Sequence, residues 1–264
     1  MRTLTAPRRR SGGFSLIELM VALVIGVIVS GAVLAFTVSS VRANSEYVQA
    51  VRLTQELRAV GQFVDSELRR AGYDEAALSY VASTSATEFS DFSPILVEDS
   101  DDDANCVIYA YDRSPGNPGQ VDLANQEVRG IRRSTVTIDG EEVGVIEMAE
   151  SDTTAPACDG AAPDYTKFPV ACNTTSGWCA FSDPRTVGID TFDINAGGDA
   201  SNSHGAQELT STGYTPMQIR EFKVSLVGHL RSNPAVTQSL SLNVKVRANC
   251  LRELMTKCNA VPGA

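Results

Sequence analysis

Residues Gly13–Met20 read GFSLIELM and stand directly behind three arginines, Arg8–Arg10. They open an apolar run in which Glu18 is the only ionisable residue before Arg42. The run is long enough for a membrane-spanning helix, which needs about 20 apolar residues. A carboxylate inside such a helix costs about 2.5–3.5 kcal/mol on insertion scales. We therefore expect a neighbouring helix to supply a positive charge that meets Glu18.

The order glycine, aromatic residue, small polar residue, two aliphatic residues and glutamate resembles the processing site of type IV prepilins and type II secretion pseudopilins. The resemblance implies that prepilin peptidase, a membrane aspartyl protease, cleaves after Gly13 and that the new amino terminus, Phe14, is methylated. It also implies that Glu18 pairs with the Phe14 ammonium of a neighbouring subunit in a filament. Residues 1–13 are then a leader peptide.

A second stretch, Leu57–Tyr73, ends in LRRAGY and resembles the end of the long helix in PilW-type minor pilins. This resemblance implies a low-abundance subunit that starts or caps a type IV pilus and supports twitching motility, adhesion or DNA uptake. The expected partners are other minor and major pilins, the prepilin peptidase, the inner-membrane assembly platform and a tip adhesin. Pseudopilin J of type II secretion is the close alternative, because it shares the N-terminal design and a bulky β domain.

The helical pattern continues beyond the apolar run. Apolar residues recur at steps of three and four residues, the spacing of one helix face: Leu53, Leu57, Val60, Val64, Leu68 and Ala71. No proline interrupts residues 14–73, and Gly72 suits the position just after a helix end. We predict one helix of about 55–60 residues. Its membrane-spanning and filament-core part is expected at 14–41, and its amphipathic part at 42–73.

Beyond Tyr73 the pattern changes to short strands and turns, which predicts an α+β fold with an antiparallel sheet packed on the helix. Alternating apolar residues and turn signals predict strands at 106–111, 131–138, 143–148, 186–194, 219–230 and 240–247. Asp139-Gly140 between two of them predicts a tight hairpin. The glycine-rich segment 196–213 is predicted as a loop and Asn233-Pro234 as a turn. Residues 74–264 are expected to form one β-rich globular domain.

The distribution of charge indicates the membrane topology. The leader holds four arginines and no acidic residue, so its removal changes the formal net charge from −10 to −14. Arginines before a membrane span place the N-terminus in the cytoplasm. A single pass through the inner membrane then puts residues 74–264 in the periplasm, before assembly into the filament. The acidic balance argues against direct binding of nucleic acid.

The chain contains six cysteines, an even number that fits disulfides in an exported domain: Cys106, Cys158, Cys172, Cys179, Cys250 and Cys258. Six cysteines allow 15 pairings, and the sequence alone does not choose among them. The short separations favour Cys172–Cys179 and Cys250–Cys258, which leaves Cys106–Cys158. A zinc site is the alternative, but its closely spaced cysteine pairs are missing.

The sequence predicts no catalytic residues and no enzyme. It contains no nucleophile elbow, phosphate-binding loop or zinc-protease motif. Its two histidines, His204 and His229, are interpreted as a residue of a solvated loop and a residue on a sheet face.

An acidic loop is the weak candidate for a bound ion. Asp99, Asp101 and Asp103 alternate as in the opening of an EF-hand calcium loop. Ala104 and Ala110 stand where that loop needs glycine and glutamate. A solvated loop is therefore the favoured interpretation, calcium stays a weak hypothesis, and no other cofactor is expected.

An ordinary signal peptide is the alternative from a different class of protein. Arg8–Arg10 would be its basic region and Leu16–Val29 its apolar core, ahead of an exported enzyme or binding domain. A domain on a plain single-pass anchor is a third reading. Against these stand Glu18 inside the apolar core and the helical pattern beyond it. The mature N-terminus separates the first two readings, because only a pilin begins with methylated Phe14.

Overall fold

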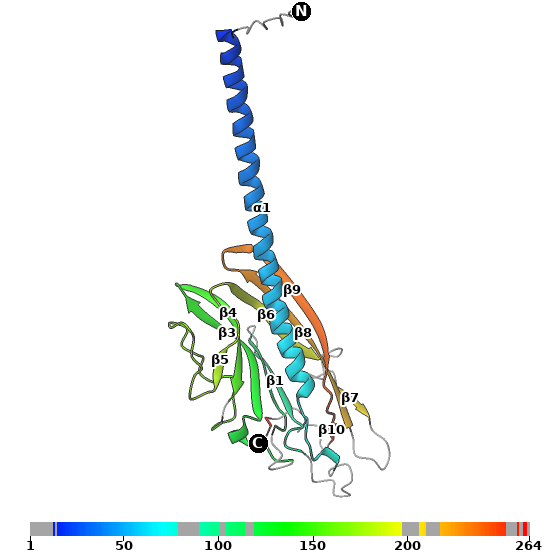
Figure 1. Ribbon diagram of the computed structural model, residues 1–264. Coiled ribbons are helices and arrows are strands. Elements are labelled where there is room, and N and C mark those ends of the chain that lie inside the picture. Colours follow the sequence, from blue (N-terminus) through cyan, green and yellow to red (C-terminus); the bar gives the residue numbers. More distant parts are fainter. Residues whose placement is uncertain are drawn as a thin grey trace, which may run out of the picture. The chain divides into compact units, whose positions relative to one another are not determined.

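The computed structural model describes residues 13, 15–78, 90–100, 104–113, 119–150, 152–196, 206–209, 217–251, 258 and 261–262. The chain divides into two compact units, residues 1–49 and 50–264. One helix, α1 (Leu16–Arg70), runs through both units, and the described strands all belong to the second (Figure 1). The predicted single helix and the α+β class are confirmed.

The end of α1 is tied to the first sheet. Gly72 has a φ of 77°, in the left-handed region that favours glycine after a helix. Its N–H donates to the carbonyl of Ala110 at 2.7 Å. Gly72 therefore ends the helix, and its own N–H bonds to a neighbouring strand.

Five antiparallel strands form the first sheet, in the order β1-β2-β3-β4-β5. They are β1 (Ile95–Ser100), β2 (Ala104–Ala110), β3 (Val128–Ile138), β4 (Glu141–Glu150) and β5 (Trp178–Ala180), with a short 3₁₀ helix η1 (Leu123–Asn125) before β3. Asp139 and Gly140 join β3 to β4 with φ values of 55° and 84°. Two-residue hairpin turns of type I′ need positive φ at both positions. The predicted hairpin is confirmed.

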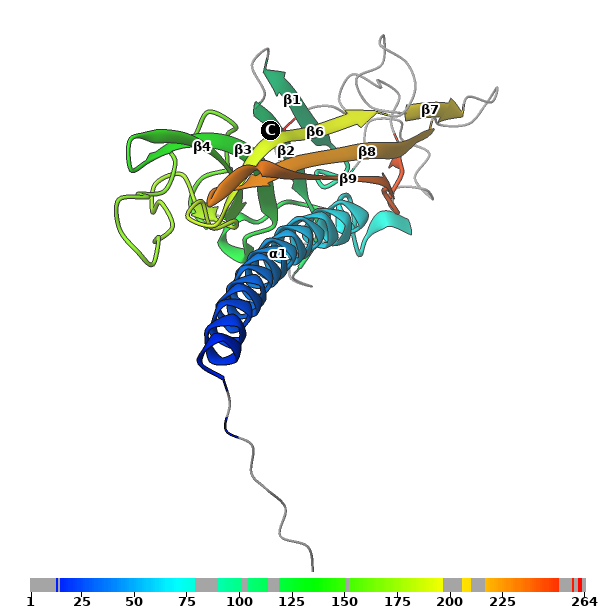
Figure 2. The same ribbon diagram turned by 90° about the horizontal axis from the view of Figure 1, so that it is seen from above.

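The second sheet is built around β8 (Met217–Leu230). On one edge β8 pairs with β6 (Val187–Ala196) and β7 (Ala206–Leu209), and on the other with β9 (Asn233–Lys245) and β10 (Cys250–Leu251). All these pairs are antiparallel. Figure 2 shows β6, β8 and β9 side by side.

Several predicted boundaries are wrong. Strand β7 lies inside the segment 196–213 that was predicted as a loop. The turn before β9 consists of Arg231 and Ser232, and Asn233-Pro234 already belongs to the strand. Proline is tolerated at the start of a strand because its missing N–H is not needed there. Strands β1, β5 and β10 are not among the predicted strands, and β5 and β10 have too few residues for a visible alternation.

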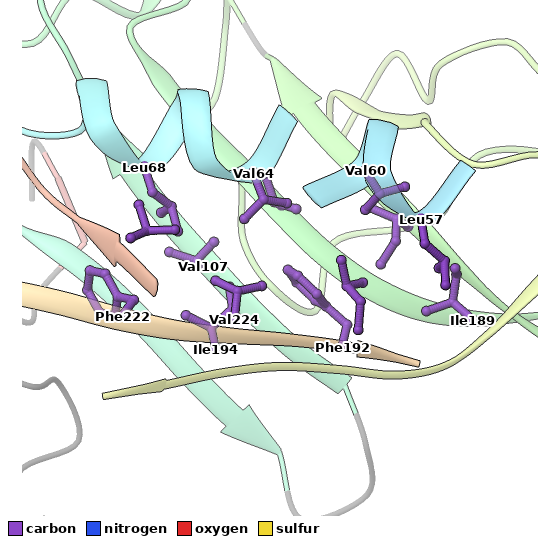
Figure 3. Packing of buried hydrophobic residues seen from close by; sticks show 14 of the residues in the cluster. Leu57, Val60, Val64, Leu68, Val107, Ile189, Phe192, Ile194, Phe222 and Val224 are labelled. Carbon is purple, nitrogen blue, oxygen red and sulfur yellow. The ribbon is translucent and has the colours of Figure 1, made fainter. Parts of the chain in front are cut away.

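The main core lies between the C-terminal part of α1 and the inner faces of both sheets. The six residues predicted from their spacing are all buried: Leu53, Leu57, Val60, Val64 and Leu68 of α1, and Ala71 directly after its end. They pack against alternate residues of β8, such as Phe222 and Val224, and against Val107 of β2 (Figure 3). The predicted alternation of β8 is confirmed.

The two sheets meet where β4 contacts β6. A Cβ atom at Gly144 would lie 1.9 Å from the carbonyl oxygen of Ile189, so this approach requires glycine. Arg133 donates to the same oxygen through Nε at 2.8 Å. Strand β6 has a bulge at Asp190 beside this contact.

A buried ion pair organises the other face of the first sheet. Arg132 of β3 binds Glu147 of β4 through Nε and Nη2, at 2.8 Å and 2.7 Å, and Glu147 is fully buried. Tyr165 donates its hydroxyl to Glu147 at 3.0 Å, and burial followed by the charge of Glu147 raises the pKa of Tyr165. The guanidinium of Arg132 also lies over Trp178 and donates to two carbonyls of loop 152–177. One arginine thus holds this loop on the sheet.

The structure contains the disulfides Cys106–Cys158, Cys172–Cys179 and Cys250–Cys258. Two of them, Cys172–Cys179 and Cys250–Cys258, are the pairings that the short separations favour, and Cys106–Cys158 is the pairing that these two leave. Cys106–Cys158 joins β2 to loop 152–177 across a separation of 52 residues. Closing a loop of this length in the unfolded chain is worth about 4 kcal/mol in the chain-entropy account.

Arg220 of β8 is fully buried close to the end of α1. Its Nη1 donates to the carbonyl of Ser93 at 2.6 Å, and its Nη2 to the carbonyl of Ala248 at 3.2 Å. Burial lowers the pKa of Arg220 to about 10, so the side chain is still charged at neutral pH. These carbonyls and the negative end of the helix dipole stabilise the charge. Arg220 therefore connects three separate segments.

Replacing Leu57 tests the main core. Leu57 is 2% exposed and lies against Gly228, so Leu57→Ala is expected to lower the free energy of unfolding by about 2–5 kcal/mol. Denaturant unfolding of the full chain in detergent, followed by the fluorescence of Trp178, measures the change. Leu23→Ala is the matched control, because Leu23 is 63% exposed in the first unit. Equal midpoints for the two variants would contradict this packing.

A double-mutant cycle tests the buried ion pair. Glu147→Leu leaves Arg132 charged and buried without its carboxylate, which is expected to cost about 3–5 kcal/mol of stability. Adding Arg132→Met removes the unpaired charge and should restore part of the loss. The same unfolding measurement gives all four free energies. Strictly additive losses would show that the two side chains do not depend on one another.

Candidate functional site

The processing motif lies at the very start of α1. Gly13 is exposed, and a Cβ atom built there would meet nothing within 4 Å. Ser15 accepts the first helical hydrogen bonds through its carbonyl oxygen, from the N–H groups of Glu18 at 3.0 Å and Leu19 at 3.1 Å. Phe14 lies outside the described residues. The regular helix thus begins immediately after the expected cleavage site that follows Gly13.

Glu18 lies in the first turn of α1, where a carboxylate interacts favourably with the positive end of the helix dipole. Its side chain is exposed, and within the described part of the chain no cation forms an ion pair with it. A carboxylate in this position is free to meet a group from outside the chain.

The helix around Glu18 presents apolar side chains in every direction. The large apolar residues from Leu16 to Val48 are all exposed within the first unit. By length and composition α1 is able to cross a membrane. Apolar surface of this extent needs lipid or other helices to cover it. The N-terminal apolar helix therefore indicates membrane anchoring.

Glu67 of α1 is a buried carboxylate that contacts side chains of the first sheet. Glu67 accepts a hydrogen bond from the Tyr109 hydroxyl at 2.9 Å and lies 3.4 Å from Nη1 of Arg129 and 3.3 Å from Nη1 of Arg70. Burial, followed by the charge of Glu67, raises the pKa of Tyr109 well above its usual value, so its hydroxyl stays a donor. The carboxylate is engaged by its own neighbours, which fits a structural role for the cluster.

His229 makes the most enzyme-like contact in the second unit. Its Nδ1 lies 2.7 Å from Oδ1 of Asp190, the bulge residue of β6, and its ring lies against Gly188. Among the described residues, no hydroxyl or thiol group bonds to the ring. A histidine and a carboxylate without a nucleophile do not make a catalytic triad. The other histidine, His204, lies outside the described residues.

The calcium hypothesis remains untested. Asp101 and Asp103 lie outside the described residues, and so does the side chain of Asp99. Within the part of the chain that the structure describes, no three His, Cys, Asp or Glu residues are grouped as they would be around a metal ion.

Comparison with known families gives one match at the N-terminal motif and one over most of the second unit. Residues 8–34 match the family described as the prokaryotic N-terminal methylation motif. Residues 46–246 match the family described as prepilin peptidase-dependent protein B. No curated protein and no solved structure matches the chain.

The two matches cover the N-terminal motif and most of the second unit. They support a pilin-like protein of pilus or pseudopilus assembly, while neither names the PilW type. Pilin-like families are typically structural. With a methylation motif at the start of α1 and a match that spans more than half of its length, the chain belongs to the prepilin peptidase-dependent protein B family.

Proposed function

We propose that this protein is a minor pilin of a type IV pilus, cleaved after Gly13 and built into the complex that starts or caps the filament. The observation that carries the proposal is Glu18, an exposed carboxylate and the only ionisable residue of its helix before Arg42. No feature of the anchor alone requires this charge. In a helix that packs beside other helices, the Glu18 carboxylate has a role if a neighbouring helix brings a cation to pair with it.

Cleavage after Gly13 creates such a cation. Hydrolysis of the Gly13–Phe14 bond frees an ammonium group on Phe14, four residues before Glu18. Four residues correspond to about 6 Å along a helix. Two parallel helices offset by about one turn therefore bring the ammonium of one chain level with the carboxylate of the other.

The Glu18–ammonium pair between chains selects the correct axial offset of the helices more than it adds stability. A buried ion pair recovers little more than its desolvation penalty, whereas a buried charge without a partner costs several kcal/mol. A subunit that arrives out of register leaves both Glu18 and an ammonium unmatched. The pair therefore favours one axial offset between helices over the others.

The second unit fits a subunit that works outside the cytoplasm. Its cysteines form three disulfides, which persist in oxidising compartments such as the periplasm. The arginines of the leader favour a cytoplasmic N-terminus. The partners are then other pilins, the prepilin peptidase, the inner-membrane assembly platform and an adhesin at the tip, and no enzymatic activity is assigned.

The segment LRRAGY, which ends at Tyr73, favours the PilW type of minor pilin over pseudopilin J of type II secretion. In the structure this segment forms the end of α1 and its stop at Gly72, with Leu68 and Ala71 buried. Recovery of the protein from sheared pili supports the pilus assignment. Recovery only with components of a secretion pseudopilus would favour the alternative.

The mature N-terminus is expected to be N-methylated Phe14. Cleavage after Gly13 removes the leader, and intact-mass and N-terminal peptide mass spectrometry of protein purified from membranes detects both changes. Gly13→Leu should keep the leader, because a bulky side chain at the cleavage site obstructs the peptidase. A mature chain that begins beyond Ser30 would instead identify an ordinary signal peptide.

Glu18→Ala is expected to be processed normally and to reach the filament at least tenfold less often than the wild type, because it lacks the carboxylate that meets the Phe14 ammonium. Quantitative immunoblots of sheared filaments and of membranes measure the two pools. Glu46→Ala is the matched control, since Glu46 is an exposed glutamate on the same helix beyond the apolar run. Equal incorporation of both variants would overturn the role of Glu18.

A further inference from the structure

Strand β9 forms a long edge of the second sheet. It has 13 residues, and among the described strands it pairs with β8 alone. The register is continuous from Thr237, opposite His229, to Lys245, opposite Glu221. One side of this strand is thus bonded along its length, and the other side meets no described strand.

The alternation of hydrogen-bonded pairs in the β8–β9 ladder determines which backbone groups of β9 lie on its open side. Val246 donates its N–H to the Arg220 carbonyl at 3.1 Å, which marks these two residues as a hydrogen-bonded pair. Hydrogen-bonded and non-hydrogen-bonded pairs alternate along an antiparallel ladder. Val244, Leu242 and Leu240 therefore also bond to β8, in the same register. The residues between them direct their N–H and C=O groups away from β8: Thr237, Ser239, Ser241, Asn243 and Lys245.

These outward residues are all exposed. No charged side chain occurs from Asn233 to Val244, and the register has no bulge between Thr237 and Lys245. Natural edge strands are commonly protected by charges, prolines, bulges or short length. From Thr237 to Val244 the open side of β9 has none of these, and its first charged residue is Lys245 at the end of the strand.

The other described edges do have such protection. Strand β1 carries Glu98 and Asp99, and β5 has only three residues. Strand β6 is contacted by the first sheet, where Arg133 binds the carbonyl of Ile189. Among the edges that the structure describes, β9 is therefore the one best suited to accept a further strand.

We propose that the open edge of β9 binds an extended, uncharged segment of a neighbouring pilin-like subunit by adding it as a strand to the second sheet. This proposal rests on the proposed function. Backbone hydrogen bonds would provide the affinity, as in other cases of strand addition. The segment would be uncharged because the small polar residues Ser239, Ser241 and Asn243 offer no opposite charge to a buried ion.

The direction of α1 argues against an antiparallel pair of two β9 strands as the arrangement at this edge. Within the second unit, α1 runs alongside β9 in the same direction, since Gly61 lies against Leu240 and Leu242 and Gly72 lies against Ala248. Antiparallel pairing of two β9 edges would point the two α1 helices in opposite directions. Subunits inserted in one membrane with one topology have their helices parallel. A segment of a different subunit can pair with the β9 edge while the α1 helices of the two subunits stay parallel.

Ser241→Pro tests the proposal without breaking the native sheet. The N–H of Ser241 points away from β8, so proline removes one outward donor and places its ring on the open edge. We expect the variant to be processed, to unfold within a few degrees of the wild type, and to reach sheared filaments at least tenfold less often. Ser241→Ala keeps the N–H and is expected to behave as the wild type. Wild-type incorporation of Ser241→Pro would overturn the proposal.

Hydrogen exchange of the unmodified protein gives a second measurement that does not depend on a variant folding. The peptide covering residues 237–245 should exchange at least tenfold more slowly at its outward amides in filaments than in the detergent-solubilised full chain. Equal exchange in both states would overturn the proposal. Failure of the wild type itself to enter filaments would contradict the proposed function instead.

A photoreactive amino acid at Ser239 identifies the occupant. Cross-linking in filaments, followed by mass spectrometry, is expected to join Ser239 to an extended segment of another pilin-like subunit. A cross-link to a second copy of this chain, to a protein outside the pilin class, or to no protein at all would overturn the proposal.

Discussion

The structure of the second unit depends on the burial of one face of α1 against two sheets at once. Residues Leu53 to Ala71 place six apolar side chains on that face, and each large one contributes about 1.5–3 kcal/mol when fully buried. Neither sheet has another described helix to cover its inner face. Without this helix, the apolar residues of β8 and of β2 would face water together. The helix therefore determines how the sheets meet.

Three buried charges of the unit have compensating partners close by. Glu147 is held by Arg132 and a tyrosine hydroxyl, and Glu67 by another tyrosine and two arginines. Arg220 uses carbonyl groups and a helix end in place of a carboxylate. Groups that are satisfied in this way stabilise a fold, whereas a catalytic group needs a free position for its substrate. This is the physical reason for interpreting the clusters as structural.

Two features remain incomplete in the isolated chain. Glu18 is a carboxylate without a described cation in an apolar helix, and β9 has an open edge with no charged residue before Lys245. Both are costly in a protein that works alone: the first in a bilayer, the second because an open edge invites aggregation. In the proposed assembly a neighbouring subunit would resolve both, one through an ion pair and one through backbone hydrogen bonds. They lie in different units, so one assembly would use two chemically independent contacts.

The sequence by itself determined the features that depend on neighbours along the chain. The three- and four-residue spacing from Leu53 predicted the buried face of α1, Asp139-Gly140 predicted the hairpin turn, and GFSLIELM located the processing motif. The tertiary structure alone decided the contacts between distant segments. Examples are the approach of Gly144 to Ile189, the carbonyl partners of Arg220, the bulge that brings Asp190 to His229, and the short strands β5, β7 and β10. Local patterns reflect backbone preference and helical or strand period, whereas these contacts exist only because the core brings separate segments together.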